Sequence, residues 1–254
     1  MYLLSYFRTD HNPTTRHTSE ALHYALSADG YSWKALNGDK PVLCGTVGTK
    51  TLRDPFIIQS NDGLFHLLST NGWEAVYILH AWSDDLITWS PQELIPVMSD
   101  VPGALNAWAP ECFFDREAKV YRLIWSATTS PSGQDEDLYQ RCWSCSTSDF
   151  RTFSRSEIFF DPGYSIIDAC VQPQGESYLM AFKDERGENA FGTHGKAIQM
   201  CSFSTTTGEW SELSELFTPT LTEGPALFVV EGEWRLISDH FLEGKMGAMS
   251  STDG

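Results

Sequence analysis

Leu52-Arg53-Asp54-Pro55-Phe56 is the first of four stretches in which a carboxylate opens an apolar segment. The other three are Trp108-Ala109-Pro110-Glu111, Ile166-Ile167-Asp168-Ala169 and Thr222-Glu223-Gly224-Pro225. The four acids follow one another at intervals of 57, 57 and 55 residues. A period of this length is typical of repeat architectures, in which each unit hides its apolar face against its neighbours. We therefore expect every repeat to supply one acid at the same position.

Two further patterns recur with the acid-bearing stretches. An apolar run with an aromatic residue near its start occurs five times, over residues 2–6, 65–69, 121–125, 178–182 and 234–238. A Ser/Thr-rich turn is followed four residues later by an aromatic residue, as in Asp29 with Trp33, Asp85 with Trp89, and Asp149 with Phe153. Short Asp side chains cap such turns through the nearby backbone, so we expect these three aspartates to be structural.

Short strands punctuated by turns at a period of about 57 residues fit the blades of a propeller. Helical repeats would need an apolar period of 3.6 residues, which these units lack. The sequence predicts an all-β fold, a five-bladed β-propeller with four-stranded blades around a central channel. The acid-bearing strand occurs four times, and the last turn pattern stops at Gly254 before its aromatic residue. We expect residues 1–254 to form a single propeller domain that lacks the end of blade five and the ring-closing strand.

The composition limits the partners of the chain. Its 254 residues carry a net charge of −17, which argues against nucleic acid or an anionic membrane as a partner. No apolar run approaches the roughly 18 residues that span a bilayer, and no secretory signal follows Met1. We expect a cytoplasmic location if Met1 is the native start.

The six cysteines show no disulfide framework. Cys142 and Cys145 form a C-x-x-C pattern, but it lies in a strand-like run where these two positions face opposite ways. No second C-x-x-C or His pair accompanies it, so we expect free thiols rather than a zinc site.

Innermost propeller strands line the central channel, so the four acids are expected to converge at one mouth of it. Inverting glycoside hydrolysis uses one carboxylic acid to protonate the leaving oxygen and one carboxylate to activate water. The two groups stand roughly 6.5–9.5 Å apart to admit that water. A third carboxylate nearby keeps the acid protonated through like-charge repulsion.

The ordered set Arg53-Asp54-Pro55, Asn106-Ala107-Trp108-Ala109-Pro110-Glu111, Ile167-Asp168-Ala169 and Glu223-Gly224-Pro225 resembles glycoside hydrolase family 43. The resemblance covers essentially the whole chain. It implies a five-bladed arabinofuranosidase, xylosidase or arabinanase relative that inverts the anomeric centre of an oligosaccharide or glycoside substrate.

The resemblance also implies roles for individual residues. Asp54 matches the general base, Asp168 the residue that tunes the acid and orients the substrate, and Glu223 the general acid. Trp108 matches a substrate contact and is expected to stack on a sugar face. Weaker candidates for substrate contacts are Arg53, Asn106, Glu111 and His240.

The chemistry itself needs no cofactor. Many family members carry a histidine on the closing strand, in some tied to a metal ion in the central channel. This chain stops before that strand, so the sequence leaves a structural metal ion undecided.

Other interpretations stay open at this stage. Asp before Pro, or Glu before Gly-Pro, can simply initiate a turn. Trp108 and His240 can be ordinary core residues. A related five-bladed glycoside phosphorylase would need a basic phosphate pocket, and Lys and Arg are scarce near the motifs. A non-catalytic sugar-binding propeller is the alternative from another class.

Overall fold

The computed structural model describes residues 1–134, 137–187 and 195–252. Its regular structure in these ranges is β, apart from the short helix α1 (Arg16–Ser19) and the 3-10 turn η1 (Asn37–Asp39). No helix in this part of the chain is long and apolar enough to cross a membrane. The first eleven strands are β1 (Tyr2–Tyr6), β2 (His23–Ser27), β3 (Trp33–Ala35), β4 (Arg53–Gln59), β5 (Phe65–Thr70), β6 (Ile78–Ser83), β7 (Glu93–Ile95), β8 (Trp108–Asp115), β9 (Val120–Thr129), β10 (Tyr139–Thr147) and β11 (Glu157–Phe160). The other six are β12 (Ile166–Gln174), β13 (Ser177–Asp184), β14 (Ile198–Phe203), β15 (Glu223–Val230), β16 (Glu233–His240) and β17 (Lys245–Ser251).

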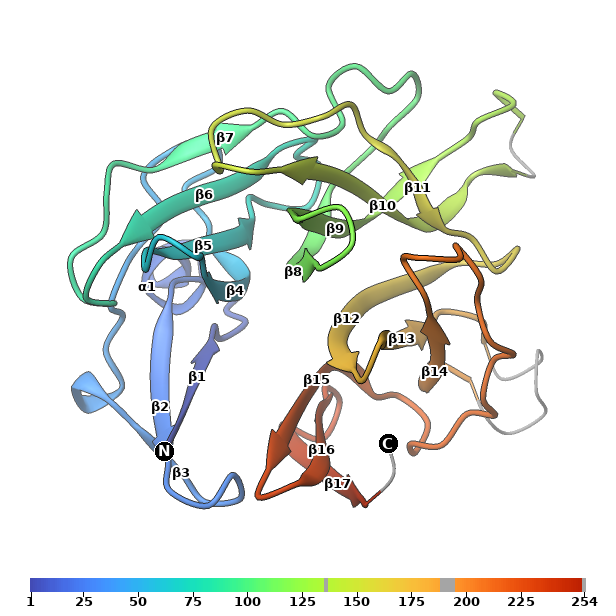
Figure 1. The fold of residues 1–254 in the computed structure, drawn as a ribbon. Coiled ribbons are helices and arrows are strands. Elements are labelled where there is room, and N and C mark those ends of the chain that lie inside the picture. Colours follow the sequence, from blue (N-terminus) through green and yellow to red (C-terminus); the bar gives the residue numbers. More distant parts are fainter. Residues whose placement is uncertain (135–136, 188–194, 253–254) are drawn as a thin grey trace. The chain divides into compact units, whose positions relative to one another are not determined.

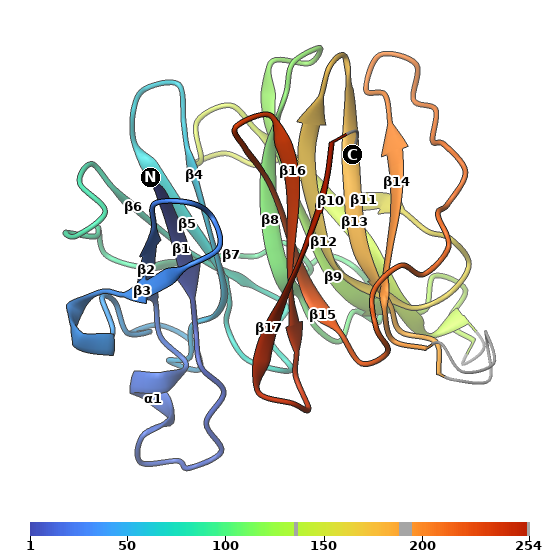
Figure 2. The same cartoon turned by 90° about the horizontal axis from the view of Figure 1, so that it is seen from below.

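These strands form five sheets, and each sheet consists of strands that follow one another along the chain. The orders are β1-β2-β3, β4-β5-β6-β7, β8-β9-β10-β11, β12-β13-β14 and β15-β16-β17. Figure 1 shows the sheets in sequence colours, and Figure 2 shows β15, β16 and β17 side by side from another direction. Consecutive antiparallel strands are the construction of a propeller blade. The five sheets confirm the all-β class and the count of five.

The prediction of four strands in every blade holds for two sheets, and the other three have three strands. In the sheet of β12–β14, the place of a fourth strand is taken by an irregular segment. Trp210 meets Phe203 through an isolated bridge, and Ser211 and Ser214 bond the edge of β14 through their hydroxyls. Because these hydroxyls accept the backbone N–H groups of Ser202 and Met200, the edge is satisfied without a regular strand.

The chain divides into two compact units. The first comprises Met1–Glu111 with Ala127–Asp137, and the second comprises Cys112–Ser126 with Leu138–Gly254. The expectation of a single domain stays a prediction.

Each unit has its own apolar core. In the first unit, Leu22, Leu52, Leu67 and Leu79 are fully buried in one cluster with Tyr24. In the second unit, the larger cluster is rich in aromatic rings and contains Phe113, Tyr178, Phe182 and Phe203. The rings of Tyr178 and Phe203 stack at 5.2 Å between centroids, a separation at which aromatic pairs attract beyond their area burial.

The repeated turns are structural, as predicted. In each turn the aspartate accepts hydrogen bonds from two backbone N–H groups: Asp29 from Tyr31 and Ser32, Asp85 from Ile87 and Thr88, and Asp149 from Arg151 and Thr152. These bonds favour the ionised carboxylate and lower the pKa of all three aspartates to about 2.

All six cysteines are free thiols, and Cys142 and Cys145 are both buried in β10.

Candidate active site

In four sheets, the first strand along the chain has a residue in the left-handed backbone conformation near its start. These residues are Asp54 (φ 48°), Ala109 (φ 47°), Asp168 (φ 56°) and Gly224 (φ 57°). In three of the sheets the pairing with the next strand shifts at this point, which marks a β-bulge. Bulges re-aim side chains and occur often beside active sites. Glycine and aspartate tolerate this conformation, whereas at Ala109 it costs about 1 kcal/mol or more.

The shared bulge corrects the expected alignment of the four acids. Asp54 and Asp168 occupy the left-handed position itself, but Glu223 lies one residue before it and Glu111 lies two residues after it. Glu223 therefore holds the place that Arg53 and Trp108 hold in their own repeats. A one-residue offset matters because successive side chains on a strand point to opposite faces. The nearly even spacing reflects the length of the repeats and not one common acid position.

Asp54 is held by the neighbouring strand of its own sheet. The hydroxyl of Thr70, the last residue of β5, donates to Asp54 Oδ2 at 2.5 Å. The same hydroxyl accepts the N–H of Ala109 at 2.8 Å. Thr70 is buried, so this two-step chain fixes the direction of the Asp54 carboxylate and links it to the start of β8.

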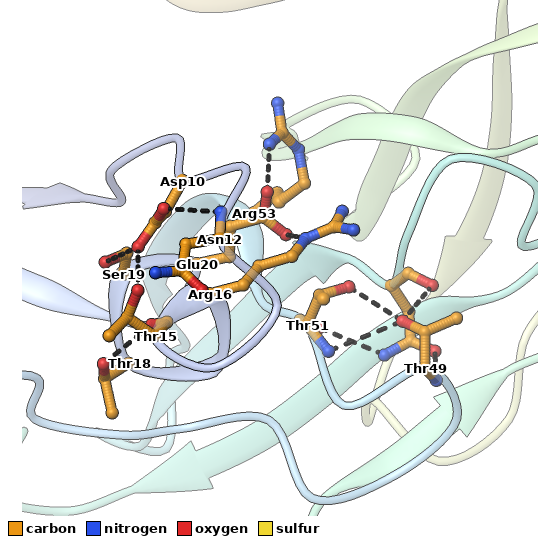
Figure 3. A network of polar contacts seen from close by, with 11 residues as sticks. Asp10, Asn12, Thr15, Arg16, Thr18, Ser19, Glu20, Thr49, Thr51 and Arg53 are labelled. Carbon is orange, nitrogen blue, oxygen red and sulfur yellow. Dashed lines mark hydrogen bonds and ion pairs between the residues drawn. The ribbon is translucent and has the colours of Figure 1, made fainter.

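Arg53, beside Asp54, contacts a carboxylate and two aromatic rings, and Figure 3 shows its ion pair with Glu20. Its Nη1 donates to Glu20 Oε1 at 2.8 Å, and its guanidinium carbon lies 4.6 Å from the ring centroids of both Phe7 and Trp73. Glu20 is 2 % exposed and also accepts from Arg16 Nε at 2.7 Å. A guanidinium stacked on aromatic faces and paired with a buried carboxylate has one available orientation.

Trp108 and Trp73 form an aromatic corner next to this guanidinium. Their rings meet edge to face at 5.6 Å, and Trp108 Nε1 donates to the Trp73 carbonyl at 2.8 Å. Trp108 is half-buried and Trp73 is exposed. This partly accessible aromatic surface suits contact with the apolar face of a sugar.

In the second unit, Asp168 lies near the start of β12, which contacts β15, the strand that begins with Glu223. Asp168 Oδ2 accepts the N–H of Gly224 at 3.0 Å, and the Asp168 N–H donates to Ser126 Oγ at 3.2 Å. Gly224 offers this N–H from a left-handed conformation that an ordinary side chain would strain. The structure thus brings Asp168 and Glu223 together at one end of the contacting strands β12 and β15.

Glu223 belongs to a chain of alternating charges. Lys183 Nζ lies 2.7 Å from Glu223 Oε2 and 2.5 Å from Glu185 Oε1, and Lys196 Nζ lies 2.9 Å from Glu185 Oε2. Burial disfavours the charged form of Lys183, but the two carboxylates outweigh it and raise its pKa above the ordinary value. Lys183 is therefore a buried cation next to the candidate acid.

Two residues at the end of β16 complete this part of the site. Asp239 is the cross-strand partner of Glu223, and burial followed by the charge of Glu223 raises the pKa of Asp239. His240 is half-buried, with Nδ1 3.8 Å from Glu243 Oε1.

The remaining candidates from the sequence occupy the first unit. Asn106 is buried and its Oδ1 accepts the Thr128 N–H at 2.6 Å, so its side chain supports the approach to β8. Glu111 is half-buried within β8. Substrate contacts by Asn106 and Glu111 stay predictions.

The sequence analysis missed Thr70, Lys183 and Asp239. Each is the register partner of the residue before a bulge: Thr70 of Arg53, Lys183 of Ile167, and Asp239 of Glu223. The sequence carried a signal for these residues, because each directly follows one of the repeated apolar runs. Thr70 and Lys183 are 113 residues apart, and Lys183 and Asp239 are 56 residues apart. Among the described residues, no three His, Cys, Asp or Glu side chains gather into a set that could hold a metal ion.

Comparison with known proteins places this geometry in context. The profile of a family described as "Probable glycosyl hydrolase domain", related to glycoside hydrolase family 43, matches residues 1–254. A curated α-L-arabinofuranosidase from Bifidobacterium longum subsp. longum is 27% identical in an alignment of 198 residues, and the match covers 67% of this chain and 19% of that protein. The chain thus spans about a fifth of the length of that relative.

Solved structures with the same fold are more distant in sequence. A thermostable family-43 glycoside hydrolase superposes with a TM-score of 0.63 at 17% identity, over 78% of this chain and 68% of the other. An α-L-arabinofuranosidase from Lactobacillus brevis gives 0.63 at 14% identity, over 84% and 70%. A Bacillus subtilis arabinanase gives 0.60 at 15% identity, over 83% and 76%. These likenesses show the five-bladed β-propeller fold.

Proposed function

Because this chain belongs to the family of probable glycosyl hydrolase domains related to glycoside hydrolase family 43, we propose that it is an inverting glycosidase. The proposed substrates are α-L-arabinofuranosides, β-xylosides or related oligosaccharides. Arabinofuranosidases, arabinanases and a xylosidase among its relatives support this substrate class.

The observation that carries the proposal is the hydrogen bond between Asp168 and Gly224. It joins a carboxylate to the residue that follows Glu223, so two acids stand at adjacent strand starts. Asp54 occupies the same bulge position as Asp168 in its own sheet. Glu223 and Asp54 thus have different surroundings, as an acid and a base in one reaction require.

In this mechanism Glu223 donates a proton to the leaving-group oxygen as the bond from that oxygen to the anomeric carbon breaks. Asp54 accepts a proton from the water that attacks the anomeric carbon from the opposite face. The Thr70 hydroxyl orients Asp54, and Asp168 holds the backbone beside Glu223. Arg53, Trp73 and Trp108 offer a rigid cation and an aromatic surface for the sugar. Carboxylates carry the whole chemistry.

The contacts around the basic side chains also favour hydrolysis over phosphorolysis. A phosphorylase needs cations that are available to phosphate. Arg53 is paired with Glu20, and Lys183 is paired with Glu185 and Glu223. We therefore expect a turnover that is independent of phosphate.

The test is a screen of aryl α-L-arabinofuranosides and β-xylosides, with the anomer of the released sugar followed by NMR. Release of sugar with inverted configuration supports the proposal, and phosphate-dependent turnover contradicts it. Asp54→Asn should lower kcat at least a thousandfold on every substrate. Glu223→Gln should lose most activity on poor leaving groups and keep more on activated phenols, which need no protonation.

Glu176→Gln is the matched control, because Glu176 is an exposed carboxylate in the turn between β12 and β13. It should keep the activity of the unchanged chain. Binding of arabino- or xylo-oligosaccharides without any release of sugar would instead identify a non-catalytic sugar-binding propeller.

A further inference from the structure

The charges around Glu223 do not balance without a proton. Lys196, Glu185, Lys183 and Glu223 alternate in sign along three ion pairs, so these four groups sum to zero. Asp239 adds a fifth charged group opposite Glu223. The like charge of Glu223 disfavours the ionisation of Asp239 and raises the pKa of that carboxyl.

The backbone determines that Glu223 and Asp239 face each other. They are register partners on β15 and β16, at the last pair before the bulge that shifts the register between Glu223 and Ala226. Directly opposite residues in an antiparallel pair have Cβ atoms about 5 Å apart and point to the same face. The two carboxyl groups therefore extend from the same face of the sheet, and the charge of Glu223 acts on Asp239.

Lys183, on β13 of the neighbouring sheet, is the cation beside Glu223. Its ammonium lies 2.7 Å from Glu223 and 4.9 Å from the ring centroid of Phe241, which follows Asp239 by two residues. Lys183 is 3 % exposed, so it is a fixed counter-ion and not a mobile surface charge. Lys183 is ion-paired with Glu223 and Glu185, and its charge also acts on Asp239 without a direct contact.

We propose that Glu223 and Asp239 act as one carboxyl pair that shares a single proton, with Lys183 as the counter-ion and Asp239 as the positioning residue for the acid. The role rests on the proposed glycosidase function and deepens it. When Glu223 is ionised, the Asp239 carboxyl passes its proton to the Glu223 carboxylate and becomes a carboxylate itself. The charge of the pair stays at −1. Glu223 then gives that proton to the leaving oxygen. After the product leaves, Asp54 releases to the solvent the proton that it took from the attacking water, and the pair takes up one proton from the solvent.

The other charged groups that face the pair define its surroundings. Asp168 on β12 accepts the N–H of Gly224, and Glu185 is paired with Lys183. His240 follows Asp239 on β16 and has Lys245 as its partner on β17. Burial and the charge of Glu223 raise the pKa of Asp239, while His240 and Lys183 act in the opposite direction.

The first test does not depend on activity. The full chain labelled with 13C at the aspartate carboxyls is titrated by NMR, and the Asp239 signal is assigned as the one absent from Asp239→Asn. In the Glu223→Gln chain the titration midpoint of Asp239 should fall by about one pH unit, because the like charge is gone. An unchanged midpoint overturns the proposal. Glu176→Gln should leave this midpoint where it is.

The second test is the pH profile of hydrolysis. Asp239→Asn should move the alkaline limb of kcat/KM about one pH unit lower for a poor leaving group, because the remaining acid loses its proton more readily. An activated phenol should react at nearly the unchanged rate, and Asp239→Glu should restore the limb. A loss of activity that is equal at all pH values and for both leaving groups overturns the role.

The two tests separate the failure of this role from that of the proposed function. If the unchanged chain hydrolyses no glycoside but the Asp239 midpoint still responds to Glu223→Gln, the pair exists and the glycosidase proposal fails. If hydrolysis proceeds and neither the midpoint nor the alkaline limb responds, the glycosidase stands and the pair is refuted.

Discussion

Thr70 donates its hydroxyl proton to Asp54 Oδ2 at 2.5 Å, from the end of the strand that pairs with the strand of Asp54. The hydroxyl is at the same time the acceptor for the Ala109 N–H. One buried side chain therefore orients the candidate base and satisfies the strained start of the next inner strand.

Replacing Thr70 by valine tests this relationship, because valine keeps the shape and removes both hydrogen bonds. A hydrogen bond to a charged group contributes roughly 1.5–3 kcal/mol, so kcat/KM for an aryl glycoside should fall about tenfold to a hundredfold. Thr70→Ser keeps the hydroxyl and should recover most of the loss. Equal activity of the valine and serine variants would contradict a role of the hydroxyl in orienting Asp54.

Glu20→Gln should destabilise the chain strongly. The substitution leaves the guanidiniums of Arg16 and Arg53 facing each other without the buried carboxylate between them. Loss of one partner from a buried ion pair costs about 3 kcal/mol or more, measured as the free energy of unfolding in urea. Asp39→Asn, which breaks the exposed pair with Arg8, should change stability by about 0.5 kcal/mol at most. Equal losses in the two variants would contradict the buried role of Glu20.

Acid should weaken the fold through a buried pair of histidines. His66 Nδ1 lies 3.0 Å from His80 Nε2, and His80 Nδ1 lies 2.7 Å from Glu93 Oε1. Burial, and then the charge of His80, lowers the pKa of His66 to about 4. Between pH 6.5 and 4 the unfolded chain binds a proton that folded His66 refuses, so stability should fall as pH falls, by about 1 kcal/mol per pH unit. Above pH 6.5 this contribution should be constant.

The measurement is the free energy of unfolding in urea at pH 7 and pH 5. His66→Gln should reduce the difference between the two values, because the variant no longer carries this titrating group. His11→Gln, at an exposed histidine, should leave the difference as it is. A His66 variant with the same pH dependence as the unchanged chain would contradict the assignment.

Gly247 lies where β17 passes the His240 ring. A Cβ at Gly247 would lie 2.3 Å from His240 Nε2, so Gly247→Ala must displace this side chain. We expect a loss of about 1–3 kcal/mol in the free energy of unfolding. In the His240→Ala background the same substitution should cost much less, because the clash is removed. Additive losses in this double-mutant cycle would show that the two residues do not meet.

The sequence alone predicted the features that depend on local chemistry. The recurrent apolar runs predicted five β-sheets, because the period-2 and turn signals are contained in each segment. Asp29, Asp85 and Asp149 were assigned to turns because an Asp side chain bonds backbone only two or three residues away. Asp54 and Asp168 were both singled out, and they do share one backbone conformation.

Tertiary structure alone decided where the acids lie and which groups they contact. Glu223 lies one residue before the left-handed position of its strand and Glu111 lies two residues after it, a difference that segment spacing does not resolve. Glu20 reaches Arg53 across 33 residues, and Lys183 reaches Glu223 across 40. The fold determines these pairs, because it brings particular strand ends together. The sequence determined which residues carry charge, and the pairing of strands decided which charges meet.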